Sequence, residues 1–313
     1  MALMEHEVST GVTLLFTAIL VGLIACLALE EKIHAKKSVI AVVFALLCLF
    51  LGEALELMPT GEMSWGGHTV NLPVFIPSVD WGVISIILGA SLFVDIVSKS
   101  GLFTWIAIRL TRVSGGDPLK LLWFYGLMTV VFSAVLNNVT AMIIVGSLTV
   151  VSLDKLKLRD KLLGFLLIEG LLTNIGGLLT LISSVPNIIV GTAAQISFVE
   201  FFLKASPYVV VATIVTLMLG ARLFAIRRIK DPEKKAKALE QVEGFDETDG
   251  IESWGFFWFS VVMLGLFIIT IATTSVLPFI SDLEMGFVAL SFSAVMLIRY
   301  KAEADQFYKA IDW

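Results

Sequence analysis

Two polar sequences interrupt the long apolar runs of this chain, and their side chains are of the types that bind small ions. One is Asn137-Asn138-Val139-Thr140, and the other extends from Thr173 to Asn187. Amide and hydroxyl oxygens can bind a cation, while the hydrogens on the same groups can bind an anion. The residues that we expect to bind an ion or substrate are Asn137, Asn138, Thr140, Thr173, Asn174, Gly176, Gly177, Ser183, Ser184, Pro186 and Asn187.

Four acidic residues lie within apolar runs: Glu53, Glu56, Asp95 and Glu169. A carboxylate in lipid is costly and is by default a functional candidate. Glu53 and Glu56 lie near one end of their run, where water can solvate them. Asp95 either forms an ion pair with Lys99, one turn later on the same helical face, or couples ion movement.

Glu169 is the leading candidate for a residue that couples proton or cation movement. It precedes the Gly176-Gly177 pair by one to two helical turns. The alternative is a carboxylate paired with a neighbouring helix.

The composition assigns these residues to a membrane protein. With 58% hydrophobic residues and a mean hydropathy of +0.94, the chain is too apolar for one soluble domain of 313 residues. Its charges are confined to short stretches between apolar runs, which argues against nucleic-acid binding. The histidines lie in terminal or loop sequence, and Cys26 and Cys48 lie in apolar runs. We therefore expect no metal site and no cofactor, with a sodium ion as the alternative.

A helix that crosses the hydrocarbon core needs about 20 mainly apolar residues, and six apolar runs of the chain meet this requirement, some of them with tilt or slightly short. They are Thr10 to Leu29, Ser38 to Met58, Gly82 to Ile108, Pro207 to Ile226, Trp254 to Leu277 and Met285 to Ile298. Lys and Arg cluster after alternate runs, which predicts an external N-terminus and a cytoplasmic connector at 227–253. We expect a multi-pass protein of the plasma (inner) membrane, with a short helix in the connector near Pro232 to Val242.

A re-entrant hairpin is predicted for 119–152. Lys120 and Lys155 bound an apolar stretch of about 32 residues, and both mark the cytoplasmic side. Asn137-Asn138 divide this stretch into arms of roughly 17 and 14 residues, which are short of a full crossing. The tip would then lie deep in the membrane, where protein or a wet cavity must surround it.

A discontinuous helix is predicted for 162–199. The Gly176-Gly177 pair weakens a helix there, and Pro186 lacks an amide hydrogen and disfavours helix at Val185. A broken helix exposes carbonyl oxygens and a helix N-terminus, the groups that bind cations and anions respectively. In the alternative interpretation, the small polar residues of both segments only mediate close helix packing in lipid.

At these segments the chain resembles the ion-transporter superfamily of citrate transporters, arsenite efflux pumps, NhaD-type sodium/proton antiporters and the P protein. It is most similar to the P-protein and arsenite-pump side. The resemblance is clearest from Val79 to Ala194 and is carried by SVDWGVISIILGASLFVDIVSKSGLF, VLNNVTAMII and EGLLTNIGGLLTLISSVPNIIVG. It implies a polar hairpin tip, then a Gly-Gly motif and a Pro-Asn pair in a discontinuous helix, with Glu169 at an acidic position before the Gly-Gly motif.

One motif departs from the family pattern. Relatives often carry Gly-Asp-Pro-Pro-Asn or Gly-Thr-Pro-Pro-Asn where this chain has Ser183-Ser184-Val185-Pro186-Asn187. A carboxylate is therefore missing from the motif, although hydroxyl groups can still bind a cation or donate to an anion.

The resemblance also implies inverted repeats. Val-Asp80-Trp81 and Ile-Asp312-Trp313 share a short sequence, and loop charges predict opposite sides of the membrane for them. We therefore expect an all-α integral membrane protein with about six full spans, a re-entrant hairpin and one discontinuous helix, forming one half of an inverted-repeat transporter in a truncated chain. The expected domains are 1–61, a two-helix segment; 78–226, the transport repeat; 227–253, the connector; 254–309, two linking helices; and 310–313, the start of a second repeat.

The expected function is secondary active transport of a small inorganic or carboxylate anion, similar to citrate or arsenite, coupled to a sodium or proton gradient. The alternatives are a sodium/proton antiporter and a truncated, non-transporting half-transporter. An intramembrane enzyme is not expected, because no histidine lies in a span and the chain has no Gly-x-Ser-x-Gly elbow. The expected partners are the small ion or anion, the lipid bilayer and, as an alternative, a second copy in a homodimer.

Overall fold

The computed structural model describes residues 9–57, 62–65, 68–71, 73, 76, 79–136, 138–274 and 284–300, and these form an all-α membrane protein apart from one short β-hairpin. The chain divides into two compact units, Met1–Asp80 and Trp81–Trp313. Seven helices in the described ranges are long and apolar enough to span a membrane. Five of them overlap the first five predicted spans, and the other two are the arms of the predicted hairpin.

The first unit contains a pair of apolar helices and a β-hairpin. Helices α1 (Thr10–Ala28) and α3 (Lys37–Ala54) confirm the first two predicted spans, and α2 (Glu30–Ile33) connects them. Gly22 allows close packing, because a Cβ there would lie 3.3 Å from the Phe44 ring. Strands β1 (Glu62–Trp65) and β2 (His68–Asn71) pair antiparallel in a stretch where no strand was predicted.

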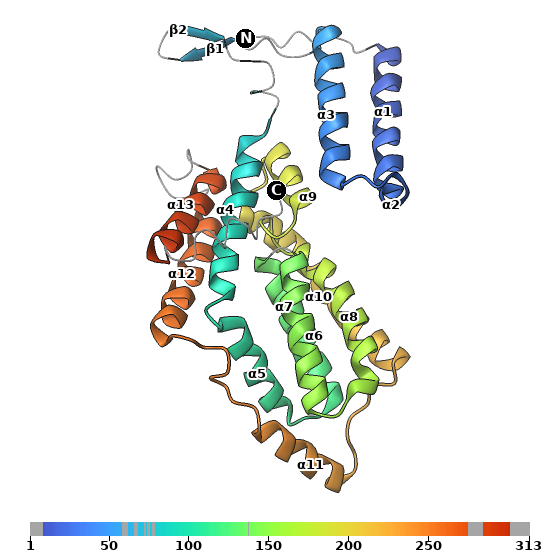
Figure 1. The fold of residues 1–313 in the computed structure, drawn as a ribbon, viewed down its shortest axis with the longest axis vertical. Helices are drawn as coiled ribbons and strands as arrows, with labels where there is room; N and C mark the ends of the chain where they lie inside the picture. The colour runs from blue at the N-terminus through green and yellow to red at the C-terminus, as the bar shows by residue number, and fades with distance from the viewer. Residues whose placement is uncertain are drawn as a thin grey trace. The chain divides into compact units, whose positions relative to one another are not determined.

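The second unit begins with a helix that is broken where one span was predicted. Helix α4 (Trp81–Ser98) ends before Gly101, and α5 (Leu102–Ser114) continues in a new direction (Figure 1). The prediction of one span from Gly82 to Ile108 is therefore wrong. Gly101 has a φ of 82°, and a Cβ at this position would lie 2.9 Å from the Gly250 carbonyl carbon. Contact with the connector, which the local sequence does not reveal, therefore fixes the break.

We expect Gly101→Ala to lower the stability of the protein by about 2–4 kcal/mol, because it adds a strained left-handed conformation to a steric clash. Thermal unfolding of the full-length protein in detergent measures this effect. Gly265→Ala is the matched control, because a Cβ at position 265 meets nothing within 4 Å. Equal melting temperatures for the two variants would contradict this account of the break.

Helices α6 (Pro118–Val135) and α7 (Asn138–Lys155) form a helical hairpin at the centre of the second unit. The Asp117 carboxylate caps α6 by accepting from the Leu119 and Lys120 amides at 3.1 Å. Each arm has 18 residues, about 27 Å of helix, so the second arm is longer than predicted. The hairpin therefore nearly matches the hydrocarbon core in length, and its re-entrant character stays a prediction.

The predicted discontinuous helix is present. Helix α8 (Leu162–Gly177) follows the short helix η1 (Arg159–Lys161), ends at the Gly-Gly pair, and packs against α6, α7 and α10. Helix α9 (Val185–Ala193) begins after the break, with Pro186 in its first turn. Helix α10 (Phe198–Leu223) packs along α8. It begins nine residues before the predicted start at Pro207, so this proline lies inside the helix and does not begin it.

The remaining helices flank this bundle. In the connector, α11 (Pro232–Glu243) confirms the predicted short helix. Arg109 and Arg112 of α5 donate to the Glu247 carboxylate at 2.7–2.9 Å, and these hydrogen bonds hold the pKa of Glu247 below its usual value. Ala238, Val242 and Phe245 are buried, so the connector packs on the bundle rather than extending into solvent.

Helices α12 (Trp254–Thr273) and α13 (Glu284–Arg299) pack beside α4 (Figure 1). Small residues allow this contact: a Cβ on Gly89 would lie 2.5 Å from the Ala289 backbone. With 16 residues, α13 is short for the full span that we predicted. The predicted start of a second repeat at 310–313 lies outside the described residues.

Candidate ion- and substrate-binding site

The tip of the α6–α7 hairpin contacts the end of α8 through polar side chains. Asn138, the first residue of α7, places its Nδ2 3.5 Å from Asn174 Oδ1. Ser133 Oγ lies 2.9 Å from Asn138 Oδ1 and 2.5 Å from the Thr173 carbonyl oxygen. The predicted tip residue Asn137 lies outside the described residues. The contacts bring together the two polar segments that were predicted to bind the ion or substrate.

Gly176 and Gly177 make this contact sterically feasible. A Cβ on Gly176 would lie 2.6 Å from the Val130 carbonyl oxygen, so α6 and α8 pack backbone to backbone there. A Cβ on Gly177 would overlap the Asn138 carboxamide and lie 2.9 Å from its Cγ and Nδ2. The Gly-Gly pair therefore leaves space for the hairpin tip, in addition to ending α8.

Residues 178–184 form the break, and side chains replace the missing helical hydrogen bonds. Asn187 Nδ2 donates to the carbonyl oxygens of Gly177 and Thr180 at 2.7 and 2.9 Å. Ser183 Oγ lies 2.7 and 3.1 Å from the same two oxygens. Asn187 and Ser183 are buried, so they hold the unwound backbone in one conformation. Thr180, whose hydroxyl donates to the Ala134 carbonyl, joins the break to the end of α6.

The other predicted site residues lie around this cluster. Ser184 is half-buried at the N-cap of α9, where its side chain makes no capping hydrogen bond, and Pro186 is exposed in the first turn. Thr140 is half-buried on α7. Ser184 and Pro186 therefore border the N-terminus of α9, and they form no described hydrogen bond with the Asn138 side chain.

Ser133 and Thr180 also form hydrogen bonds in this polar cluster, and neither was among the predicted site residues. Both have hydroxyls that bond to the main chain of another segment, at Thr173 and Ala134 respectively. Ser133 lies one helical turn before the hairpin tip, and this spacing was the available signal. The partner of Thr180 is 46 residues away, so only the fold reveals it.

Glu169 lies on α8 two turns before the Gly-Gly pair and is completely buried. Its Oε1 accepts from Thr149 Oγ1 of α7 at 2.7 Å, and its Oε2 has no hydrogen-bond partner among the described residues. The Glu169 carbonyl accepts from Thr173 Oγ1 at 2.8 Å. The described surroundings thus place a hydroxyl, and no cation, beside this carboxyl group.

Asp95 lies apart from Glu169. It belongs to α4, which packs against α13, α9, α12 and α5, whereas α8 packs against α6, α7 and α10. Asp95 is half-buried, and its buried Oδ2 has no hydrogen-bond partner among the described residues. The two predicted coupling residues therefore do not form one site in this structure.

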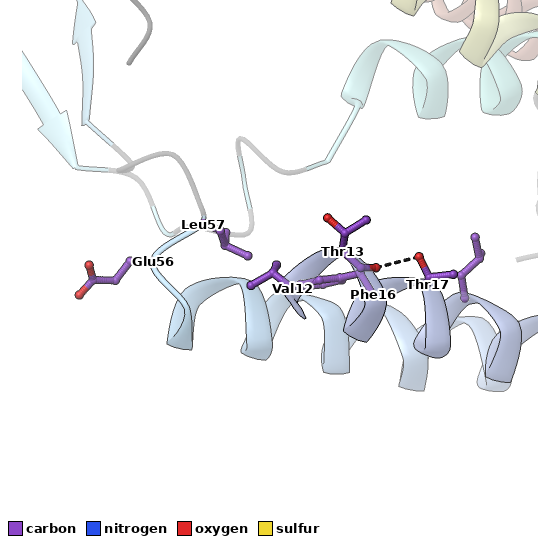
Figure 2. A pocket seen from close by; sticks show the side chains of 7 residues that line it. Val12, Thr13, Phe16, Thr17, Glu56 and Leu57 are labelled. Carbon is purple, nitrogen blue, oxygen red and sulfur yellow. Dashed lines mark hydrogen bonds between the residues drawn. The ribbon is translucent and has the colours of Figure 1, made fainter. Parts of the chain in front are cut away.

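A cavity of about 40 Å³ lies between α4 and α9 beside Ser91, Ser183 and Ser184, which is room for about one water molecule. In the first unit, α1 and the end of α3 border an open pocket of about 470 Å³ (Figure 2). Thr17 there donates to its own helix at 2.7 Å, and Glu56 points away from the other labelled side chains. The lining of this pocket is mostly apolar and includes Thr13, Thr17 and Glu56.

The comparisons with known proteins agree with a transporter. A family model described as "Citrate transporter" matches residues 24–313. The chain is 28% identical over 236 residues to a 46 kDa membrane protein of Mycobacterium leprae and 26% identical over 235 residues to an uncharacterized transporter of Mycobacterium tuberculosis. Each alignment covers 75% of this chain and 52% of the relative, so the chain spans about half the length of these relatives. The human P protein is 29% identical over 193 residues, which cover 60% of this chain and 21% of that protein.

Proposed function

Because the chain belongs to the citrate transporter family, we propose that its hairpin tip and broken helix form half of the binding region of a secondary active transporter. The observation that carries this proposal is the contact of Asn138 and Ser133, at the tip of the hairpin, with Asn174 and the Thr173 carbonyl near the end of α8. Helices that end inside a membrane bundle, next to polar side chains, are typical of transporter binding sites. A second, inverted half or a second copy of the chain would complete the region.

The N-termini of two helices at the polar region favour a small anion as the substrate. Helices α7 and α9 both begin at the polar region, at Asn138 and after Ser184. Helix N-termini carry a partial positive charge and free amide hydrogens, which bind carboxylate or oxyanion groups. Amide and hydroxyl side chains supply further donors. We therefore propose a small inorganic or carboxylate anion, similar to citrate or arsenite.

The alternative of a sodium/proton antiporter rests on the carbonyl oxygens at the break. Asn187 and Ser183 gather the carbonyls of Gly177 and Thr180 at one place, and carbonyl oxygens are cation ligands in broken helices. These same donors already occupy the two oxygens. The Asp of related motifs corresponds to Ser184 in this chain, so a sodium ion there would lack a carboxylate ligand. This observation favours the anion transporter.

Glu169 is the proposed coupling residue. A carboxylate without a cation in a buried site is an uncompensated charge, so this arrangement favours the protonated acid. Movement of α8 against α7 would change this environment and release the proton. Binding and release of a proton would then be linked to alternating access.

We expect Asn138→Ala to lower the initial rate of transport by at least about tenfold, because the variant removes a hydrogen-bonding side chain that connects the two polar segments. Uptake and efflux in sealed vesicles, with sodium, protons, arsenite and di- or tricarboxylates tested in turn, measure the effect. Gln241→Ala is the control, because it removes an amide from α11 in the connector. Wild-type rates for a correctly inserted Asn138→Ala variant would refute the proposed site.

A further inference from the structure

An apolar groove lies between α8 and α10 of the second unit. Its volume is about 540 Å³, which is within the range of sites that bind small molecules. Four exposed leucines border it: Leu167 and Leu171 on α8, and Leu219 and Leu223 on α10. Among the described residues that line it, Thr216 alone has a polar side chain. The groove is therefore suited to a hydrocarbon chain.

Two glycines explain why the groove forms between these helices. A Cβ on Gly220 of α10 would lie 2.5 Å from the Ile168 side chain, so the helices approach closely at this position. A Cβ on Gly170 of α8 would meet nothing within 4 Å, although this residue also lines the groove. Close approach at Gly220 and an unfilled position at Gly170 leave a furrow between the rows of leucines.

The groove ends beside basic residues. Helices α8 and α10 are antiparallel, because Gly164 in the first turn of α8 packs against Phe224, directly after α10, while Ile168 packs against Gly220. The start of α8 and the end of α10 therefore lie at one end of the groove, where the chain continues toward α11 (Figure 1). We call this the basic end of the groove, and its residues are Lys161, Arg222 and Arg227. It is predicted to face the cytoplasm.

The basic end carries a net positive charge. Arg222 and Arg227 are exposed, and neither forms an ion pair with a residue in the part of the chain that the structure describes. Lys161 pairs with Asp160 at 3.3 Å. Two guanidinium groups thus have no described counter-ion, at the place where the apolar groove reaches the predicted membrane surface.

We propose that the groove binds an anionic phospholipid, with an acyl chain between α8 and α10 and the phosphate at Arg222 and Arg227. The leucines match the chain, and guanidinium groups bind phosphate oxygens through paired hydrogen bonds. Basic residues next to the cytoplasmic end of a membrane-spanning helix are typical of sites for anionic lipids. A helix of a second copy could fill the groove, but it would bring no phosphate to the arginines. This inference does not depend on the proposed transport function.

The preference for a charged headgroup tests the basic end. Native mass spectrometry of the full-length protein in detergent would measure binding of dioleoylphosphatidylglycerol and of dioleoylphosphatidylcholine. We expect the anionic lipid to bind at least about tenfold more tightly, and Arg222→Gln combined with Arg227→Gln to abolish this preference. The matched control combines Lys234→Gln with Lys235→Gln, because it removes two charges from α11, which packs against α5 rather than α8 or α10. The control should keep the preference.

Gly170→Leu tests the acyl-chain part of the site. The new side chain would occupy the empty space beside position 170, so the affinity for dioleoylphosphatidylglycerol should fall by about tenfold or more. Gly265→Leu is the control, because it makes the same change at a position of α12 where a Cβ also meets nothing within 4 Å. The Gly265→Leu protein should bind the lipid as the wild type does.

Three outcomes would overturn the proposal. Equal affinity of the wild-type protein for the two lipids would show ordinary contact with the bilayer. Equal loss of the preference in the two charge variants would indicate a diffuse electrostatic attraction without a site. Unchanged lipid binding by Gly170→Leu, with loss of a dimer in light scattering, would assign the groove to a second copy. Arg222 and Arg227 are exposed, so their variant tests the proposal even if Gly170→Leu does not fold.

Discussion

Gly177→Ala is expected to abolish most transport, with initial rates reduced by at least about tenfold, which corresponds to overpacking of about 1–3 kcal/mol at the site. The added methyl group would overlap the Asn138 carboxamide and displace the hairpin tip from α8. It would also disturb the Gly177 carbonyl, which accepts from Asn187 at 2.7 Å. Initial rates in sealed vesicles, corrected for the amount of inserted protein, measure the effect.

Gly170→Ala is the control for this prediction. Gly170 lies on the same helix two turns earlier, and a Cβ at this position meets nothing within 4 Å. The two variants make the same chemical change on the same helix. Equal rates for Gly177→Ala and Gly170→Ala would show that the Gly-Gly pair has no part in the site.

Glu169→Gln is expected to remove the dependence of transport on the ion gradient. Glutamine has the shape of protonated glutamic acid and retains an oxygen that can accept from Thr149, so the fold should be preserved. It cannot release a proton. Accumulation of substrate against its own gradient should therefore fall to simple equilibration, while substrate exchange continues. Uptake into vesicles with imposed proton or sodium gradients measures both quantities.

Glu200→Gln serves as the control for Glu169→Gln. Glu200 is exposed on α10 and pairs with Lys204 at 2.7 Å, so its neutralisation should leave coupling unchanged. Unchanged gradient dependence in a Glu169→Gln protein that inserts normally would contradict the coupling assignment. Asp95, whose buried Oδ2 also has no hydrogen-bond partner among the described residues, would then be the next residue to test.

The sequence predicted the parts of the fold that depend on local composition. Long apolar runs predicted α1, α3, α10 and α12, because a membrane-spanning helix is defined mainly by its length and its hydrophobicity. The break between α8 and α9 was predictable because Gly176, Gly177 and Pro186 act on the local backbone. The β-hairpin of the first unit was missed, since its short strands carry no strong periodic pattern.

Features that depend on distant partners could not be predicted. The break at Gly101 depends on Gly250, and the Thr149 hydroxyl reaches Glu169 from another helix. Asn138 and Gly177 were predicted to belong to one site, with helix breaking as the role of the glycine. The structure adds the steric reason, which is space for the Asn138 carboxamide.

The central claim is that the break between α8 and α9 belongs to the substrate-binding region, and alkylation of Ser184→Cys tests it most directly. The full-length protein would carry Cys26→Ala and Cys48→Ala, so that position 184 provides the reactive thiol within this chain. Leu171→Cys in the same background is the control, because Leu171 is exposed on α8 before the break. The account predicts that the transported anion slows alkylation by N-ethylmaleimide at position 184 and leaves the rate at position 171 unchanged. Equal alkylation rates at position 184 with and without a saturating transported anion would contradict it.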